Sequence, residues 1–159
     1  MQGKYFFIFI FLFLFLCSPV GAQQEKYYHL TGDKMAEYIQ KKRGNTHVVY
    51  FYTSWCGPCQ TMMPDIIEIE KSRKGSVTVI SMDHDQESLI RYLNKHPDFP
   101  FHRIIVKYDR SVDLAQELQN IGILYRGSFP HVVFYNADGS VKEQGPFKAP
   151  AIREFFNMI

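Results

Sequence analysis

Residues 46–59 read THVVYFYTSWCGPC, a strand-like run followed by two cysteines. The run from Thr46 to Tyr52 is dense in β-branched and aromatic residues and nearly free of charge, which is typical of a strand buried on both faces. Cys56 and Cys59 follow a short loop, and the apolar residues beyond them recur at helical spacing as far as Lys74-Gly75. We therefore expect a buried strand, a loop, and a helix that begins at the two cysteines.

Strand-like and helix-like segments alternate along the rest of the chain, and no repeat or Pro/Gly/Ser-rich linker divides it after residue 22. Thr31 can cap the first helix, and Pro64 should kink the helix that carries the cysteines. This alternation predicts an α/β fold with a mixed β-sheet flanked by helices. The other expected elements are helices at 31–42, 86–95, 111–121 and after Pro150, strands at 77–82 and 102–107, and a hairpin at 131–141, whereas residues 23–29 are assigned to no element.

The first 22 residues have the three parts of a secretory signal. Lys4 supplies the positive charge, residues 5–17 form an unbroken apolar run of 13, and small side chains close the segment at residues 18–22. The run is short for a membrane span, which needs about 20 residues. We expect a signal peptide at 1–22 and one domain at 23–159, exported to the periplasm or another extracytoplasmic compartment. An uncleaved anchor and a lipidated Cys17 stay as alternatives.

Composition and charge narrow the class of protein. Of the 159 residues, 46% are hydrophobic and 21% are charged, as in an ordinary globular protein. The formal net charge is +2, and the basic residues are scattered apart from Lys41-Lys42-Arg43, which we interpret as a solvated helix end. Such a balance gives no reason to expect nucleic acid or an anionic membrane surface as a partner.

Removal of the signal would leave Cys56 and Cys59 as the only cysteines. A disulfide that closes so small a loop constrains little of the unfolded chain, so the pair is poor as a staple and good as a redox couple. Unpaired N–H groups and the dipole at a helix start stabilise a thiolate, which lowers the pKa of Cys56 from about 8.5 toward neutrality. We expect a solvent-accessible Cys56 to be the nucleophile and Cys59 the resolving thiol, with Gly57 and Pro58 holding the turn between them.

The motif Trp55-Cys56-Gly57-Pro58-Cys59 after a hydrophobic strand resembles the active-site sequence of the thioredoxin family. Pro64 matches the helix-kinking proline of that family, and Phe129-Pro130 resembles its cis-proline site. The resemblance covers about Thr31 to the C-terminus, and it implies a thioredoxin fold, a Cys56–Cys59 redox disulfide, and substrate binding by Phe129, Pro130 and Trp55. A zinc site would need a second ligand pair, and the histidines are isolated, so we expect no metal and no other cofactor.

Two features depart from a minimal thioredoxin. First, 47 positions separate Asp83 from Pro130, more than the basic form of the family needs. The excess, at about 84–110, predicts a central helix–strand insertion and resembles exported bacterial thiol–disulfide oxidoreductases that reduce apocytochromes or other extracytoplasmic proteins. Second, Tyr50 and Met62 stand where cytosolic and exported members, respectively, have a buried acid. We therefore expect water, the substrate or an unrecognised group to deprotonate the resolving thiol, with slower resolution or a shifted optimum and no loss of function.

Several side chains near the motif have two interpretations. Phe129 can shape a substrate groove or fill the core. His131 follows the proline and can tune the first cysteine, but a histidine at the start of a strand is more often solvent-facing. We expect Tyr50 and Tyr52 to be sheet residues and Met62 to fill the core.

The sequence thus predicts an enzyme, a protein disulfide oxidoreductase that reduces disulfides of cysteine-containing exported proteins and contributes to cell redox homeostasis. Gly57-Pro58 between the cysteines resembles thioredoxin more than its strongly oxidising relatives. In an oxidising compartment the enzyme would need a membrane-embedded thiol electron donor, and we expect it to be a monomer. Alternatives are a disulfide oxidase or isomerase, a copper or zinc carrier, and a thioredoxin-fold adaptor without turnover, which the two missing acids favour.

Overall fold

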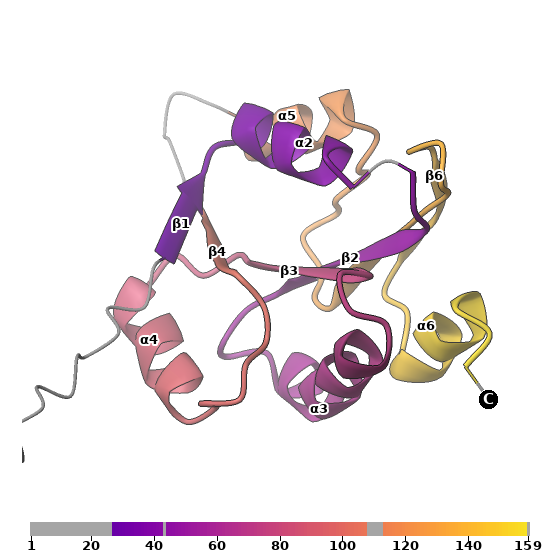
Figure 1. Cartoon of the computed structure of the whole chain (residues 1–159). Coiled ribbons are helices and arrows are strands. Elements are labelled where there is room, and N and C mark those ends of the chain that lie inside the picture. The colour runs from indigo at the N-terminus through magenta and orange to yellow at the C-terminus, as the bar shows by residue number, and fades with distance from the viewer. Residues whose placement is uncertain (1–26, 43, 108–112, 159) are drawn as a thin grey trace, which may run out of the picture.

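The computed structural model describes residues 27–42, 44–107 and 113–158, and the predicted signal peptide with Cys17 lies outside them. Within these residues no helix is long and apolar enough to cross a bilayer. Strands and helices alternate as the sequence predicts (Figure 1). The strands are β1 (Tyr27–Leu30), β2 (His47–Tyr52), β3 (Val77–Ser81), β4 (Arg103–Val106), β5 (His131–Tyr135) and β6 (Val141–Gly145). The helices are α2 (Gly32–Gln40), α3 (Gly57–Ser72), α4 (Gln86–Asn94), α5 (Leu114–Asn120) and α6 (Ala149–Phe155).

The strands form one mixed sheet in the order β1-β4-β3-β2-β5-β6. The first four strands of this order are parallel, whereas β5 runs antiparallel to β2 and β6 runs antiparallel to β5. Strand β4 lies between β1 and β3, so the central helix–strand insertion contributes a strand to the interior of the sheet. The predicted thioredoxin fold, with a mixed sheet flanked by helices, is confirmed.

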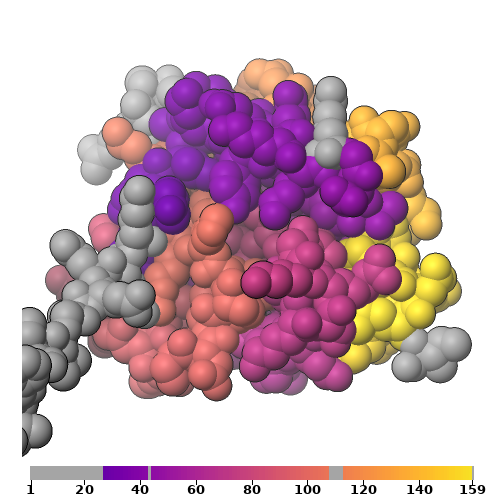
Figure 2. All heavy atoms as spheres, viewed as in Figure 1, coloured from indigo at the N-terminus to yellow at the C-terminus, as the bar shows by residue number. Residues whose placement is uncertain are grey.

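Strand β2 is buried along its whole length because helices cover both faces of the sheet. Alternate residues such as Tyr50 and Tyr52 point to the face covered by α3, α4 and α6. The residues between them, Val49 and Phe51, point to the face covered by α2 and α5. Figure 1 shows these two helical layers, and in Figure 2 the residues of α3 lie between those of the α4–β4 region and those of α6.

Helix α3 begins at the cysteine pair, as predicted. Cys56 is its N-cap residue, with an extended backbone at φ −78° and ψ 105°, and Pro58 lies in the first turn, where its missing N–H costs nothing. Pro64 lies inside the helix, while the kink that we expect there stays a prediction. The apolar side of α3, including Met63 and Ile66, is fully buried against the sheet.

The N-terminal part of the fold differs from the prediction in two places. Residues 27–30, which the sequence pattern left unassigned, form the edge strand β1 because β4 offers a parallel partner. Thr31 is the N-cap residue of α2, but its hydroxyl donates to the carboxylate of Asp33 and caps no backbone N–H group. Local polar contacts thus replace the expected cap.

Helix α5 begins three residues later than predicted. Asp113 has an extended backbone, and its carboxylate accepts hydrogen bonds from the N–H groups of Ala115 and Gln116 at 3.0 and 3.3 Å. This cap sets the first helical residue at Leu114 and not at 111, and residues 108–112 lie outside the described part of the chain.

Candidate active site

Cys56 and Cys59 form a disulfide, with 2.08 Å between the sulfurs, at the N-terminus of α3. The Sγ atom of Cys56 accepts a hydrogen bond from the backbone N–H of Cys59 at 3.2 Å. Since N–H groups at a helix start favour negative charge, the same group can stabilise a thiolate on Cys56 after reduction. The structure therefore brings the two predicted redox residues together at a helix start.

The two cysteines differ in their access to solvent. Cys56 keeps 5% of its surface exposed, whereas Cys59 keeps none. In the disulfide form the expectation of an accessible first sulfur is thus met only to a small extent. The neighbours of the pair are open, because Gly57 and Pro58 are exposed and Trp55 is 68% exposed. A partner molecule would reach Cys56 before Cys59.

The cis-proline loop lies beside this motif. The peptide bond between Phe129 and Pro130 is cis, as predicted. The rings of Trp55 and Phe129 meet edge to face, with 6.2 Å between their centroids. Phe129 is half-buried and also packs against the hydrophobic cores on both faces of the sheet. Its ring therefore packs into the core and also contacts Trp55 of the motif, while its part in a substrate groove stays a prediction.

A hollow of about 410 Å³, the motif hollow, opens between α3, the cis-proline loop and the start of α6. Pro58 of the redox motif and Pro130 both line it, so the two predicted site segments face one space. Most of its lining is apolar. The remaining lining residues are Thr61, Met62, Asp65, Pro146, Lys148, Ala149 and Pro150.

The family model described as Thioredoxin matches residues 26–107, slightly more than half of the chain. The chain belongs to the thioredoxin family. The curated thioredoxin-like protein slr1139 of Synechocystis is 40% identical over 52 residues, which cover 31% of this chain and 48% of that protein. The chain spans less than half the length of this and the other first curated relatives that it matches.

Solved structures of the thioredoxin family have a similar fold. A thiol:disulfide interchange protein from Chlorobium tepidum matches with a TM-score of 0.58 and 16% identity, over 75% of this chain and 82% of that one. A secreted disulfide oxidoreductase of Mycobacterium tuberculosis, homologous to DsbE of E. coli, matches with a TM-score of 0.55 and 17% identity, over 76% of this chain and 86% of that one. At these identities the likeness establishes the fold.

In this thioredoxin-family chain, Tyr50 lies behind the second cysteine. Its hydroxyl donates a hydrogen bond to the carbonyl oxygen of Cys59 at 3.3 Å. Burial raises the pKa of Tyr50 well above its ordinary value, so the phenol stays protonated. Met62, at the other position that the family resemblance marks, is buried and lines the motif hollow. Neither residue supplies a carboxyl group beside the second cysteine.

The prediction that His131 faces solvent is wrong, and the alternative that it tunes the first cysteine gains no support, because its ring lies on the face of the sheet opposite the cysteines. His131 is 4% exposed, because helices α2 and α5 cover this face of the sheet. Its ring packs against Phe51 and Tyr125, with centroids 6.1 and 5.8 Å apart, on the side away from the disulfide. Because side chains alternate along a strand, the next residue, Val132, points to the face of the sheet that carries the cysteines. Burial lowers the pKa of His131, so the imidazole is neutral near pH 7.

A polar cluster beside the motif escaped the sequence interpretation. Asp83, two residues after the end of β3, is 3% exposed and accepts hydrogen bonds from the backbone N–H and the hydroxyl of Ser54. The position of Asp83 at the end of a predicted strand is the sequence signal that could have identified it. The carboxyl ends of parallel β2 and β3 meet at one edge of the sheet, and the motif leaves β2 at that edge.

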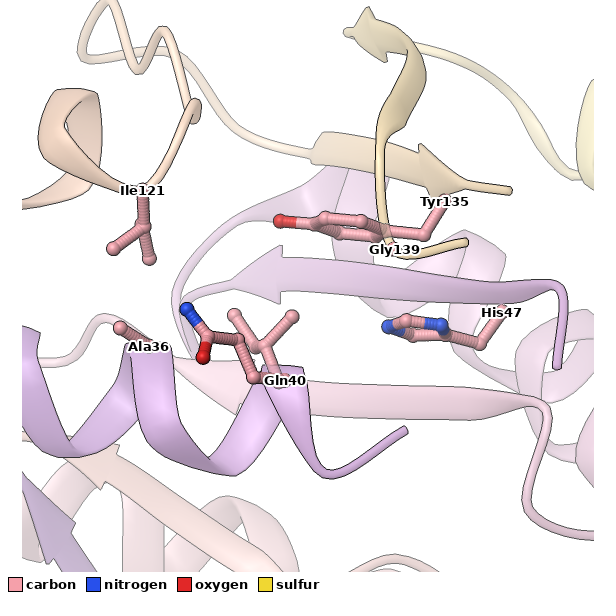
Figure 3. A pocket seen from close by; sticks show the side chains of 7 residues that line it. Ala36, Gln40, His47, Ile121, Tyr135 and Gly139 are labelled. Atoms are coloured by element: carbon pink, nitrogen blue, oxygen red, sulfur yellow. The ribbon is translucent and has the colours of Figure 1, made fainter. Parts of the chain in front are cut away.

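Another hollow, of about 60 Å³, lies at the opposite end of β2 from the cysteines (Figure 3). The rings of His47 and Tyr135 stack there with 4.7 Å between centroids. The His47 Nε2 atom and the Tyr135 hydroxyl have no hydrogen-bond partner among the described residues, and the space is large enough for ordered water. Among the described residues no three His, Cys, Asp or Glu side chains gather as a metal site requires.

Proposed function

We propose that this chain is a thiol–disulfide oxidoreductase that reduces disulfides of exported proteins by cycling Cys56 and Cys59 between dithiol and disulfide. The observation that carries the proposal is the Cys56–Cys59 pair at the start of α3, with the Cys56 sulfur against the N–H group of Cys59. The domain would span 23–159 behind a signal peptide at 1–22, and it would act as a monomer.

The reaction proceeds in two exchanges. The Cys56 thiolate attacks one sulfur of the substrate disulfide, that bond breaks, and the departing substrate thiolate takes a proton from solvent. Cys59 then loses its proton and attacks the Cys56 sulfur, which closes the Cys56–Cys59 disulfide and releases the second substrate thiol. Two electrons pass from the chain to the substrate. A membrane-embedded thiol donor returns them.

The substrate would bind to the surface around the disulfide. Trp55 offers a large exposed ring beside Cys56, and Phe129 holds that ring from one side. The motif hollow, with Pro58 and Pro130 on its walls, suits an extended peptide segment with apolar side chains. The segment would lie across the cis-proline loop with its own cysteine next to Cys56.

The residues between the cysteines support the reducing direction, and the first 22 residues support the exported location. Gly57-Pro58 between the cysteines supports a reductant, as in thioredoxin, whose potential is about −270 mV. Residues 1–22 support export, and the fold likeness to a secreted disulfide oxidoreductase agrees with it.

Reduction of insulin disulfides in the presence of dithiothreitol tests the chemistry. The protein with residues 23–159 should accelerate insulin precipitation, and Cys56→Ser should abolish the acceleration. In the full chain Cys17→Ser serves as the matched control and should keep full activity. A chain without activity above that of Cys56→Ser contradicts the proposal and supports an adaptor.

Two further measurements separate direction and substrate. The reduction potential should lie near that of thioredoxin, and a value near about −120 mV would identify an oxidase. Cys59→Ser cannot complete the second exchange, so it should accumulate exported proteins as mixed disulfides on Cys56. Their identification names the substrate, and the absence of any trapped protein contradicts reduction of exported proteins.

A further inference from the structure

A buried carboxylate lies at the carboxyl end of the strand next to the redox motif. Asp83 follows β3, and only 3% of its surface is exposed. No lysine, arginine or histidine of the described residues forms an ion pair with it. A buried carboxyl group costs free energy unless hydrogen bonds satisfy it.

Most of the hydrogen bonds that Asp83 accepts come from Ser54. The Ser54 N–H group donates to both carboxylate oxygens of Asp83, at 3.1 and 2.9 Å, and the Ser54 hydroxyl donates to Oδ1 at 2.6 Å. The Ser81 hydroxyl donates to Oδ2 at 2.7 Å and accepts from the Asp83 N–H at 3.1 Å. Asp83 therefore joins the end of β3 to one residue of the loop before the cysteines.

Ser54 is the first central residue of a turn that delivers Cys56. The N–H of Cys56 donates to the carbonyl oxygen of Thr53 at 3.2 Å, which closes the turn over Ser54 and Trp55. The carbonyl oxygen of Ser54 accepts from the side-chain amide of Gln60 in α3. With Asp83 on its N–H and hydroxyl and Gln60 on its carbonyl, Ser54 is held at every polar group.

We propose that Asp83 is a positioning residue for the redox motif. By fixing Ser54 it holds the Thr53–Cys56 turn, and this turn keeps the Cys56 sulfur against the N–H group of Cys59. After reduction that contact stabilises the Cys56 thiolate. The inference rests on the proposed dithiol–disulfide cycle, but it concerns the acidity of one thiol and not the identity of the substrate.

A carboxylate suits this task better than an amide. An asparagine at position 83 would present one oxygen and one NH₂ group, so it could not accept from the Ser54 N–H at both of its terminal atoms. A second buried carboxylate provides a comparison, because Glu70 accepts from the N–H groups of Gly75 and Val77 at 2.6 and 2.9 Å, at the other end of β3. Glu70 braces the fold in the same way, far along α3 from the cysteines.

The test compares Asp83→Asn and the milder Ser54→Ala with the matched control Glu70→Gln, all in the reduced protein. The pH profile of iodoacetamide alkylation reports the pKa of Cys56, and thermal melting reports stability. We expect Asp83→Asn to raise the Cys56 pKa by about one unit, which lowers its alkylation rate about fivefold near neutral pH and about tenfold well below the pKa. Ser54→Ala, which keeps the backbone contact, should shift the pKa in the same direction by less. Glu70→Gln should lower the melting temperature and leave the Cys56 pKa unchanged.

A purely structural Asp83 would give a different result. Melting temperatures would fall in all three variants while the Cys56 pKa stayed at the wild-type value, and this outcome overturns the proposal. If Asp83→Asn does not fold, Ser54→Ala decides alone. A raised Cys56 pKa in that variant supports the proposal, and an unchanged Cys56 pKa overturns it. Alkylation needs no protein substrate, so a wild-type chain that fails to reduce insulin rejects the proposed function without deciding the role of Asp83.

Discussion

The hydroxyl of Tyr50 donates a hydrogen bond to the carbonyl oxygen of Cys59, 3.3 Å away, from a strand that is buried on both faces. The phenol thus contacts the backbone of the resolving cysteine. Burial raises the pKa of Tyr50, so the hydroxyl cannot take a proton from that thiol near neutral pH. In the proposed cycle, solvent or substrate must accept this proton, which should limit the second exchange.

A Tyr50→Asp change should therefore speed resolution of the mixed disulfide. The new carboxylate would lie beside Cys59 and accept its proton once ionised. Single-turnover rates of substrate release at several pH values measure the effect. We expect an increase of about tenfold or more, up to the roughly 10²–10⁴-fold that a well-placed general base contributes. Burying a carboxyl group and losing a packed ring should also reduce stability by about 3 kcal/mol or more.

Tyr50→Phe is the matched control, since it keeps the ring and removes only the hydroxyl. Its cost should be about 1 kcal/mol in the free energy of unfolding, with no gain in the resolution rate. An unchanged rate in a folded Tyr50→Asp protein would show that proton transfer from Cys59 does not limit the exchange.

Trp55→Ala should weaken the reaction with protein disulfides while the fold remains intact. The ring is 68% exposed, so its loss removes little core packing, whereas a contact at the centre of a binding surface is worth about 1 kcal/mol or more. The expected result is a several-fold decrease in kcat/KM for insulin, with a smaller decrease for a small aromatic disulfide.

Leu124→Ala provides the comparison for Trp55, because Leu124 is the other large hydrophobic side chain that is exposed among the described residues, at 51%. It should leave both kcat/KM values near those of the wild type. Equal losses in the two variants would mean that exposed apolar area in general, and not Trp55 beside the disulfide, governs substrate binding.

The fold was accessible from the sequence because the strongest patterns belong to buried elements. The β-branched and aromatic run at β2 and the cysteines at a helix start indicate both a strand and the start of the next helix. Strand β1 escaped prediction because its four residues alternate weakly and become a strand only through pairing with β4, more than 70 positions later. Long-range pairing of a short edge strand leaves almost no local signal.

The site was predictable where one motif carries it and unpredictable where the fold assembles it. Cys56, Cys59 and the cis bond before Pro130 could all be anticipated from the resemblance. The contact between Asp83 and Ser54 could not, because it joins two loops 29 positions apart. The burial of His131 was missed because a strand start says nothing about the helices that cover it.

His131 should make stability depend on pH. Burial lowers its pKa, so between that lowered value and the ordinary value near 6.5 the unfolded chain binds more protons than the folded chain. Its contribution is fully present above the ordinary value and is lost as the pH falls toward the folded-state value. Urea unfolding from about pH 7.5 to about pH 5.5 should show this decline, with a smaller decline in His131→Phe.

His47 is the internal comparison, because burial lowers its pKa as well. A His47→Phe change should remove a separate part of the decline, and the double variant should remove both parts. If the decline in His131→Phe equals that of the wild type, the imidazole of His131 is not held neutral by the fold.

The insertion helix α4 should behave as part of the core and not as an appendage. Leu93 is 1% exposed and belongs to the hydrophobic cluster that also contains Cys59 and Ile66, so its loss opens a cavity in the core layer shared with the redox helix. Leu93→Ala should therefore cost about 2–5 kcal/mol in the free energy of unfolding. Far-ultraviolet circular dichroism and the fluorescence of the single tryptophan, Trp55, should change together in one unfolding transition. Asn94→Ala, at an exposed neighbouring position, is the control and should have a free energy of unfolding near that of the wild type. Two separate transitions, or a cost below about 1 kcal/mol, would mean that α4 folds apart from the sheet that carries the cysteines.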